Sequence, residues 1–304
     1  MTQLLNALPG ALAQGLIWGV MAIGVYITYK VLDIADLTVD GSICTGAAVC
    51  TMLLLGGQSP WLALLCAVLA GVLAGAVTGL LHVGLGIPPI LAGILTQMVL
   101  WSVNLKLLGK ANQALPARTT PVLLSQMDVA GALPVLLGFC VVLVALLVLF
   151  FGTELGCALR ATGCNPVMSR AQGVNTGLMK IIGLALSNGV VALSGALLCQ
   201  YQGYTDVNMG RGAVVIGLAA VVIGQAVLGR RGGRMAVQLG GVILGAVIYY
   251  IVYQVIIFAG FDTDLLKMFS AVVVAVFLGA PHVKAQLKAH SRSKKGDSGH
   301  AENE

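Results

Sequence analysis

Residues 131–180 read GALPVLLGFCVVLVALLVLFFGTELGCALRATGCNPVMSRAQGVNTGLMK, a long apolar run that turns polar after Gly152. Residues 131–152 contain no Asp, Glu, Lys or Arg, and VVLVALLVLF at 141–150 does not alternate between apolar and polar side chains. An α-helix needs about 20 apolar residues to cross a ~30 Å hydrocarbon core, whereas a transmembrane β-strand alternates over ~10 residues. The stretch therefore predicts a membrane-spanning helix followed by a polar loop.

The composition of the whole chain fits the same fold class. Hydrophobic residues make up 58% of the 304 residues and charged residues 9%, and the mean hydropathy is +0.97. Soluble domains carry about 25% charged residues, which keep their surfaces hydrated. These values exclude a soluble enzyme, a nucleic-acid-binding module and a disordered scaffold. The net charge of +6 therefore does not indicate a nucleic-acid partner.

Charge-free stretches and short polar breaks recur along the chain. Each stretch should be helical, because backbone polar groups in lipid must bond within their own segment. We expect an all-α polytopic membrane protein with about nine spans, surrounded by membrane lipid. The span at 41–56 is short and could be broken or re-entrant. The spans lie near residues 9–29, 41–56, 60–82, 87–108, 131–152, 178–200, 212–229, 236–259 and 265–281.

The positions of Lys and Arg set the orientation. Twelve of the 17 lie on one side of the alternating assignment, which makes that side cytoplasmic and puts the N-terminus outside. The basic tail 282–304 lacks an apolar face and is expected to be a disordered cytoplasmic segment. Arg211 falls in an outer loop, and no acidic residue falls inside a span. The lack of intramembrane carboxylates argues against ion-coupled transport.

The polar segment 154–180 carries start and stop signals for a short helix. Asn165 is a favourable N-cap and Pro166 suits the first helical position, while Gly173 suits the left-handed residue after a helix end. Asn175 or Thr176 can then cap the next span. Such a helix could dock a cytoplasmic motor or lie on lipid headgroups. Docking is favoured, because residues 166–172 contain no Trp, Phe or Leu to insert into the interface.

Sequence patterns for catalysis and metal binding are missing. The chain has no G-x-x-x-x-G-K-[ST] phosphate loop, no C-x-x-C pair among its seven cysteines and no H-E-x-x-H. We therefore expect a non-catalytic chain without a metal site or cofactor of its own. If ATP drives it, ATP and Mg²⁺ must be bound by another chain.

Three blocks resemble the ABC importer permeases of the ribose and branched-chain amino acid type. These blocks are 159–198, which matches the coupling-helix region, 217–250, and the early helix pair in 21–48 with its turn Asp36-Leu37-Thr38-Val39-Asp40-Gly41. Within that family, 26–46 is most similar to permeases paired with tryptophan- or tyrosine-type binding lipoproteins. Asp40 is a departure, since a small residue is common at that position.

The resemblance implies a type II ABC importer permease in the bacterial cytoplasmic membrane. It implies a transmembrane permease domain over 1–281, with the cytoplasmic coupling loop at 154–180. Its expected partners are an ABC ATPase dimer, an extracytoplasmic substrate-binding protein or lipoprotein, and a second copy of the permease, most simply in a homodimer. The solute implied by the subgroup is an amino acid or a related molecule, with aromatic amino acids first. The alternative is a channel or secondary transporter that works alone.

We predict residues for three roles: coupling to the ATPase, packing between helices and lining of the translocation path. Gly71, Gly75 and Gly79 are spaced four apart and predict a small-residue stripe for close helix packing. Asp36, Asp40, Gln97 and Asn188 are the path candidates. The carboxylates could instead cap a turn at a helix N-terminus, and the amides could only join helices. The coupling candidates are Arg160, Ala161, Gly163, Asn165, Pro166, Met168, Arg170, Gly173 and Asn175.

Overall fold

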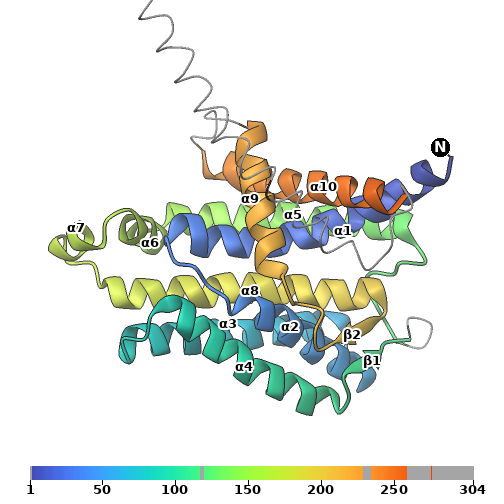
Figure 1. Ribbon diagram of the computed structural model, residues 1–304, viewed down its shortest axis with the longest axis horizontal. Coiled ribbons are helices and arrows are strands. Elements are labelled where there is room, and N and C mark those ends of the chain that lie inside the picture. The colour runs from blue at the N-terminus through green and yellow to red at the C-terminus, as the bar shows by residue number, and fades with distance from the viewer. Residues whose placement is uncertain (1, 117–119, 229–233, 259–274, 276–304) are drawn as a thin grey trace, which may run out of the picture. The chain divides into compact units, whose positions relative to one another are not determined.

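Two helices, α1 (Thr2–Tyr26) and α8 (Thr176–Gln202), form the centre of the bundle in the computed structural model, which describes residues 2–116, 120–228, 234–258 and 275. Within their apolar spans, 83% and 72% of the residues are buried, against 22% for α5 (Val129–Gly152). Figure 1 shows α1 and α8 running along the length of the bundle with other helices packed beside them.

The remaining elements complete the bundle. The first helix continues through a π-helical turn, η1. Two three-residue strands pair antiparallel, with Asn112 opposite Asp206 and Ala114 opposite Tyr204. The other elements are η1 (Ile27–Val31), α2 (Val39–Leu55), α3 (Pro60–Gly84), α4 (Pro89–Leu108), β1 (Asn112–Ala114), α6 (Glu154–Cys164), α7 (Pro166–Ala171), β2 (Tyr204–Asp206), α9 (Ala213–Leu228) and α10 (Met235–Phe258).

Six helices in the described part of the chain are long and apolar enough to cross a membrane. Two more apolar helices are shorter, α2 with 17 residues and α9 with 16. These eight helices correspond to the first eight predicted spans. The ninth, at 265–281, and the tail 282–304 lie outside the described residues, apart from residue 275.

Small residues let the helices approach α8 closely. A Cβ at Gly79 would lie 2.8 Å from the Cα of Ile181, and Gly71 and Gly75 lie against the carbonyl oxygens of Asn188 and Leu184. The predicted stripe on α3 therefore faces α8. In lipid, such close approach replaces the hydrophobic effect as the source of helix association, through dispersion contacts.

The chain between η1 and α2 is not helical and lies inside the bundle. Asp33 has a left-handed φ of 56°, and Asp36 is only 5% exposed. Asn188, near the middle of α8, donates from Nδ2 to Asp36 Oδ2 at 2.7 Å and accepts from Ser42 at 2.6 Å. The predicted span at 41–56 thus begins at half depth. The sequence placed no acidic residue within a span, and Asp36 lies in the break between spans, where it is nevertheless buried inside the bundle.

Candidate functional site

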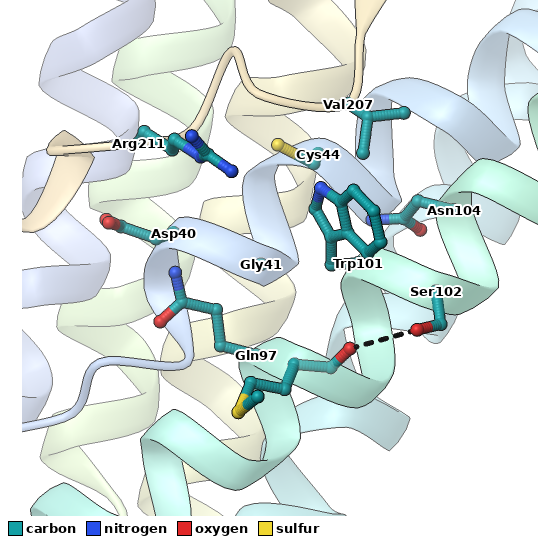
Figure 2. A pocket seen from close by; sticks show the side chains of 10 residues that line it. Asp40, Gly41, Cys44, Gln97, Trp101, Ser102, Asn104, Val207 and Arg211 are labelled. Atoms are coloured by element: carbon teal, nitrogen blue, oxygen red, sulfur yellow. Dashed lines mark hydrogen bonds between the residues drawn. The ribbon is translucent and has the colours of Figure 1, made fainter. Parts of the chain in front are cut away.

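A cavity of about 520 Å³ lies between α2, α4 and the turn that precedes α9. Its wall combines two charged residues, two carboxamides, an indole and a thiol (Figure 2). Small-molecule sites commonly enclose about 300–1,000 Å³ with a few polar groups among apolar ones, so the cavity has the size of a solute site. The residues used below are Asp40, Cys44, Gln97, Trp101, Asn104 and Arg211.

Asp40 joins the N-termini of α2 and α9. Its Oδ2 accepts from the Gly212 backbone N–H at 3.0 Å, and its Oδ1 accepts from the Val214 N–H at 3.0 Å. The first amides of a helix lack partners within the helix and carry partial positive charge, so a carboxylate stabilises them. Asp40 therefore caps α9 from another helix. Figure 2 shows its carboxylate pointing away from Trp101.

Arg211 and Trp101 border the cavity from opposite elements. The guanidinium of Arg211 points toward the side where Cys44 and Trp101 lie, and Trp101 is 44% exposed (Figure 2). Within the described chain, Arg211 makes no ion pair or side-chain hydrogen bond. The sequence assigned it to an outer loop, and the structure places it, exposed, in the turn between β2 and α9. Its neighbour Gly212 bonds to Asp40 at the start of α2, inside the bundle.

Asn104 is buried beside the same cavity. The residue is 1% exposed, and neither Oδ1 nor Nδ2 has a hydrogen-bond partner in the described part of the chain. By contrast, the buried side chains of Thr38, Thr78 and Thr96 bond to one another at 2.8 and 2.9 Å. Most buried polar atoms in folded proteins are bonded in this way, so Asn104 is an exception.

The four predicted path residues fall into two pairs. Gln97 and Asp40 line the cavity, although Asp40 turns its carboxylate toward α9. Asp36 and Asn188 do not line it and are bonded to each other, while Asp36 Oδ1 also accepts from the Thr38 N–H at 2.8 Å. Asp36 does cap a turn, as the alternative interpretation held, but the turn is buried rather than solvated.

The polar segment 154–180 begins with two short helices, α6 and α7, which lie at one end of the bundle (Figure 1). Asn165 caps α7 by accepting from the Val167 and Met168 N–H groups at 3.1 and 3.0 Å. Asn175 caps α8 through the Leu178 N–H, and Gly173 has a φ of 84°. The capping pattern thus predicted α7 correctly, but α6 was not predicted.

The two arginines of this segment hold it together. Arg160 donates to the carbonyl oxygen of Phe151 at the end of α5 at 3.1 Å, and Arg170 donates to Thr176 Oγ1 at 2.8 Å. Gly163 of α6 lies against the carbonyl oxygen of Val31, and Gly183 of α8 lies against Leu32. Ala161, Pro166 and Met168 are exposed.

In the described residues, no group of three or more His, Cys, Asp or Glu side chains could hold a metal ion.

A protein-family model described as "branched-chain amino acid transport system / permease component" matches residues 8–280. The chain belongs to this permease family. It is 37% identical over 292 residues to the tyrosine transport system permease protein of Clostridioides difficile (strain R20291), covering 93% of this chain and 94% of that relative. It is 29% identical to the autoinducer 2 import system permease protein LsrC of Escherichia coli (strain K12 / DH10B), over 67% of this chain and 60% of LsrC.

The fold of the permease also matches a solved structure. A chain described as that of a metal-chelate type ABC transporter in an inward-facing conformation superposes with a TM-score of 0.53 at 15% identity, over 91% of this chain and 85% of that one. At this identity the match concerns the fold alone. Family and fold together identify a multi-pass membrane protein that is the permease component of an ABC transporter.

Sequence reasoning missed the role of Arg211 and Trp101 in shaping the permease's cavity. The available signal for Arg211 was its position between Gly210 and Gly212, directly before an apolar run at 213–228. A charge at the start of a short span marks a possible intramembrane ionisable group. Trp101 gave no such signal, because indoles are common near membrane interfaces.

Proposed function

We propose that this permease imports tyrosine or a closely related amino acid across the bacterial cytoplasmic membrane in an ATP-driven cycle. A separate ATPase dimer would bind ATP and Mg²⁺, and an extracytoplasmic binding protein would deliver the solute. The permease itself would carry no cofactor. The substrate rests on the tyrosine transport permease relative, which is 37% identical along nearly its whole length. About nine spans in a type II importer arrangement would complete the fold.

The observation that carries the coupling proposal is the exposed apolar tip of α7. Val167 is 75% exposed and Met168 is 64% exposed, on a helix that lies outside the spans. Two exposed apolar side chains on a capped helix suit insertion into a cleft of a partner protein. Behind them, Ser169 is buried and bonds back to the Asn165 carbonyl oxygen at 2.9 Å, so α7 would move as a rigid unit.

The contacts of α6 would pass this movement to the membrane helices. Gly163 touches Val31 at the end of η1, and Leu159 is fully buried next to Gly183 of α8. Both α1 and α8 lie at the centre of the bundle and contact the break that contains Asp36. A rigid-body shift of α6 and α7 would therefore tilt the central helices, in the manner of interface-driven switching.

The polar cavity supports the pairing of two permease copies. Arg211 is exposed, and its neighbour Gly212 bonds through its N–H to Asp40 at the start of α2. A guanidinium facing hydrocarbon is costly, and such groups usually face a bundle interior or a water-filled cavity. A second copy facing this side would enclose an aqueous path. A homodimer is the simplest closed arrangement of one permease sequence.

The coupling proposal can be tested by a double substitution in α7. Val167→Glu together with Met168→Glu should leave the permease folded in detergent but abolish its co-purification with the partner ATPase. The matched control is Met127→Glu, because Met127 is 78% exposed in the segment before α5, at the end of the bundle opposite α7. Full assembly and solute-stimulated ATP hydrolysis by the double variant would disprove the proposed docking.

The alternative was a channel or secondary transporter that acts alone. The family disfavours it, since the model describes a component of a transport system. The buried Asp36 gives it little support, because both carboxylate oxygens are already bonded to Thr38 and Asn188. This alternative predicts tyrosine flux through liposomes that contain the permease without ATP.

A further inference from the structure

The cavity beside α4 contains a buried carboxamide without a partner. Leaving a buried polar group unbonded destabilises a fold, and an apolar side chain of the same shape avoids that penalty. Asn104 nevertheless occupies a position that is 1% exposed, behind Trp101 in the cavity wall (Figure 2). Both of its polar atoms lack a bond in the described chain. Both atoms are also closed to solvent, so a ligand in the cavity would supply the missing partner once the neighbouring wall, including Trp101, shifts.

The same cavity contains a cation without a counter-ion. Asp40 is the nearest acidic side chain in the cavity wall, but its two oxygens are bonded to the first amides of α9. Arg211 therefore remains without an ion pair among the described residues. A guanidinium offers two parallel N–H groups that match a carboxylate, and this pairing is strong where water is scarce.

A large aromatic surface faces the space between these two groups. The Trp101 indole is 44% exposed, and Gln97 lies one helical turn before it on α4 with its carboxamide in the same cavity (Figure 2). Stacking of aromatic rings stabilises binding beyond the burial of apolar area alone. The cavity thus presents a carboxylate site, an aromatic face and a buried hydrogen-bonding group within about 520 Å³.

We propose that this cavity binds an aromatic amino acid as it passes through the permease. Arg211 binds the carboxylate, Trp101 stacks on the aromatic ring, and Asn104 hydrogen-bonds to a polar group of the solute. The inference rests on the proposed function and goes further, because it makes the permease itself, and not only the delivering protein, a contributor to solute selection.

Direct binding tests this site without relying on transport. The full-length permease in lipid nanodiscs carries Trp18→Phe and Trp61→Phe, so that Trp101 is the remaining tryptophan. Its fluorescence is excited where tyrosine does not absorb and is followed during titration with L-tyrosine and with tyramine, which lacks the carboxylate. We expect saturable quenching by L-tyrosine, with binding about tenfold or more weaker for tyramine and for Arg211→Gln. Arg211→Lys should retain part of the affinity, and Lys110→Gln is the matched charge control.

Asn104→Leu separates a binding role from a structural one. If Asn104 serves the solute, the leucine variant should unfold at the same or a higher temperature while its affinity for L-tyrosine falls. Unchanged affinity in Asn104→Leu and Arg211→Gln, or equal quenching by tyramine, would overturn the proposal. Intact binding combined with no ATP-driven tyrosine uptake would instead refute the proposed function and leave the site standing.

Discussion

Replacing Gly75 with alanine should loosen the contact between α3 and α8. A Cβ on Gly75 would lie 2.8 Å from the Cα of Ala185 and closer still to the carbonyl oxygen of Leu184. Carbon atoms in contact normally lie about 3.5–4.0 Å apart, so the two helices must separate by roughly 0.7–1.2 Å at this level. The obstacle is the backbone of α8, which cannot rotate away as a flexible side chain could. Overpacking of this kind costs about 1–3 kcal/mol.

Replacing a second glycine that has free space around it separates the packing cost from other effects of the substitution. Gly138 lies within α5, and a Cβ there would meet no described atom within 4 Å. Both substitutions gain the same helix propensity, about 1 kcal/mol, so the difference between them reports the packing contact. Thermal unfolding of the two purified variants in detergent should give a Tm at least about 2 °C lower for Gly75→Ala. Equal Tm values, or a higher one for Gly75→Ala, would refute the close-packing explanation of the stripe.

Three further predictions concern polar contacts. Asn188→Leu removes the amide that bonds Asp36 and should lower the free energy of unfolding by about 1.5–3 kcal/mol, measured by chemical denaturation, whereas an unchanged value would make the 2.7 Å bond irrelevant to stability. Asn165→Ala removes the N-cap of α7 and should destabilise it by about 1 kcal/mol, seen as faster amide exchange confined to 166–171. Asp40→Ala should speed exchange of the Val214 amide, and equal protection would contradict the capping role of Asp40.

Local rules predicted the elements that depend on local interactions. The lengths of the charge-free stretches predicted the spans. This rule is local, because a backbone polar group in lipid must be bonded within its own helix, whatever the helix packs against. Capping chemistry located α7, because Asn165 bonds to amides only two and three residues away. The helix α6 has no apolar span, but Thr153 at its N-cap and Glu154 in its first turn were local signals for its start.

The interior polar groups could not be predicted from local pattern. Counting residues along a span places Asp36 in a cytoplasmic turn, and only the contact with Asn188, 152 residues away, explains its burial. The link between Asp40 and the start of α9 could not be predicted for the same reason, since Asp40 accepts from the Gly212 N–H across 172 residues. Gln97 was chosen because a lipid-facing amide is costly, and that argument applies equally to Asn188, which the structure places away from the cavity.

We propose that this permease moves solute only when a separate ATPase drives it. The most direct test is uptake of labelled L-tyrosine into proteoliposomes that contain the permease, its partner ATPase and the cognate binding protein. We predict accumulation against a gradient with ATP and Mg²⁺ on the ATPase side, and none with the permease alone or with a hydrolysis-deficient ATPase. Accumulation of L-tyrosine, or its steady flux, through the permease alone would contradict the dependence of transport on the ATPase.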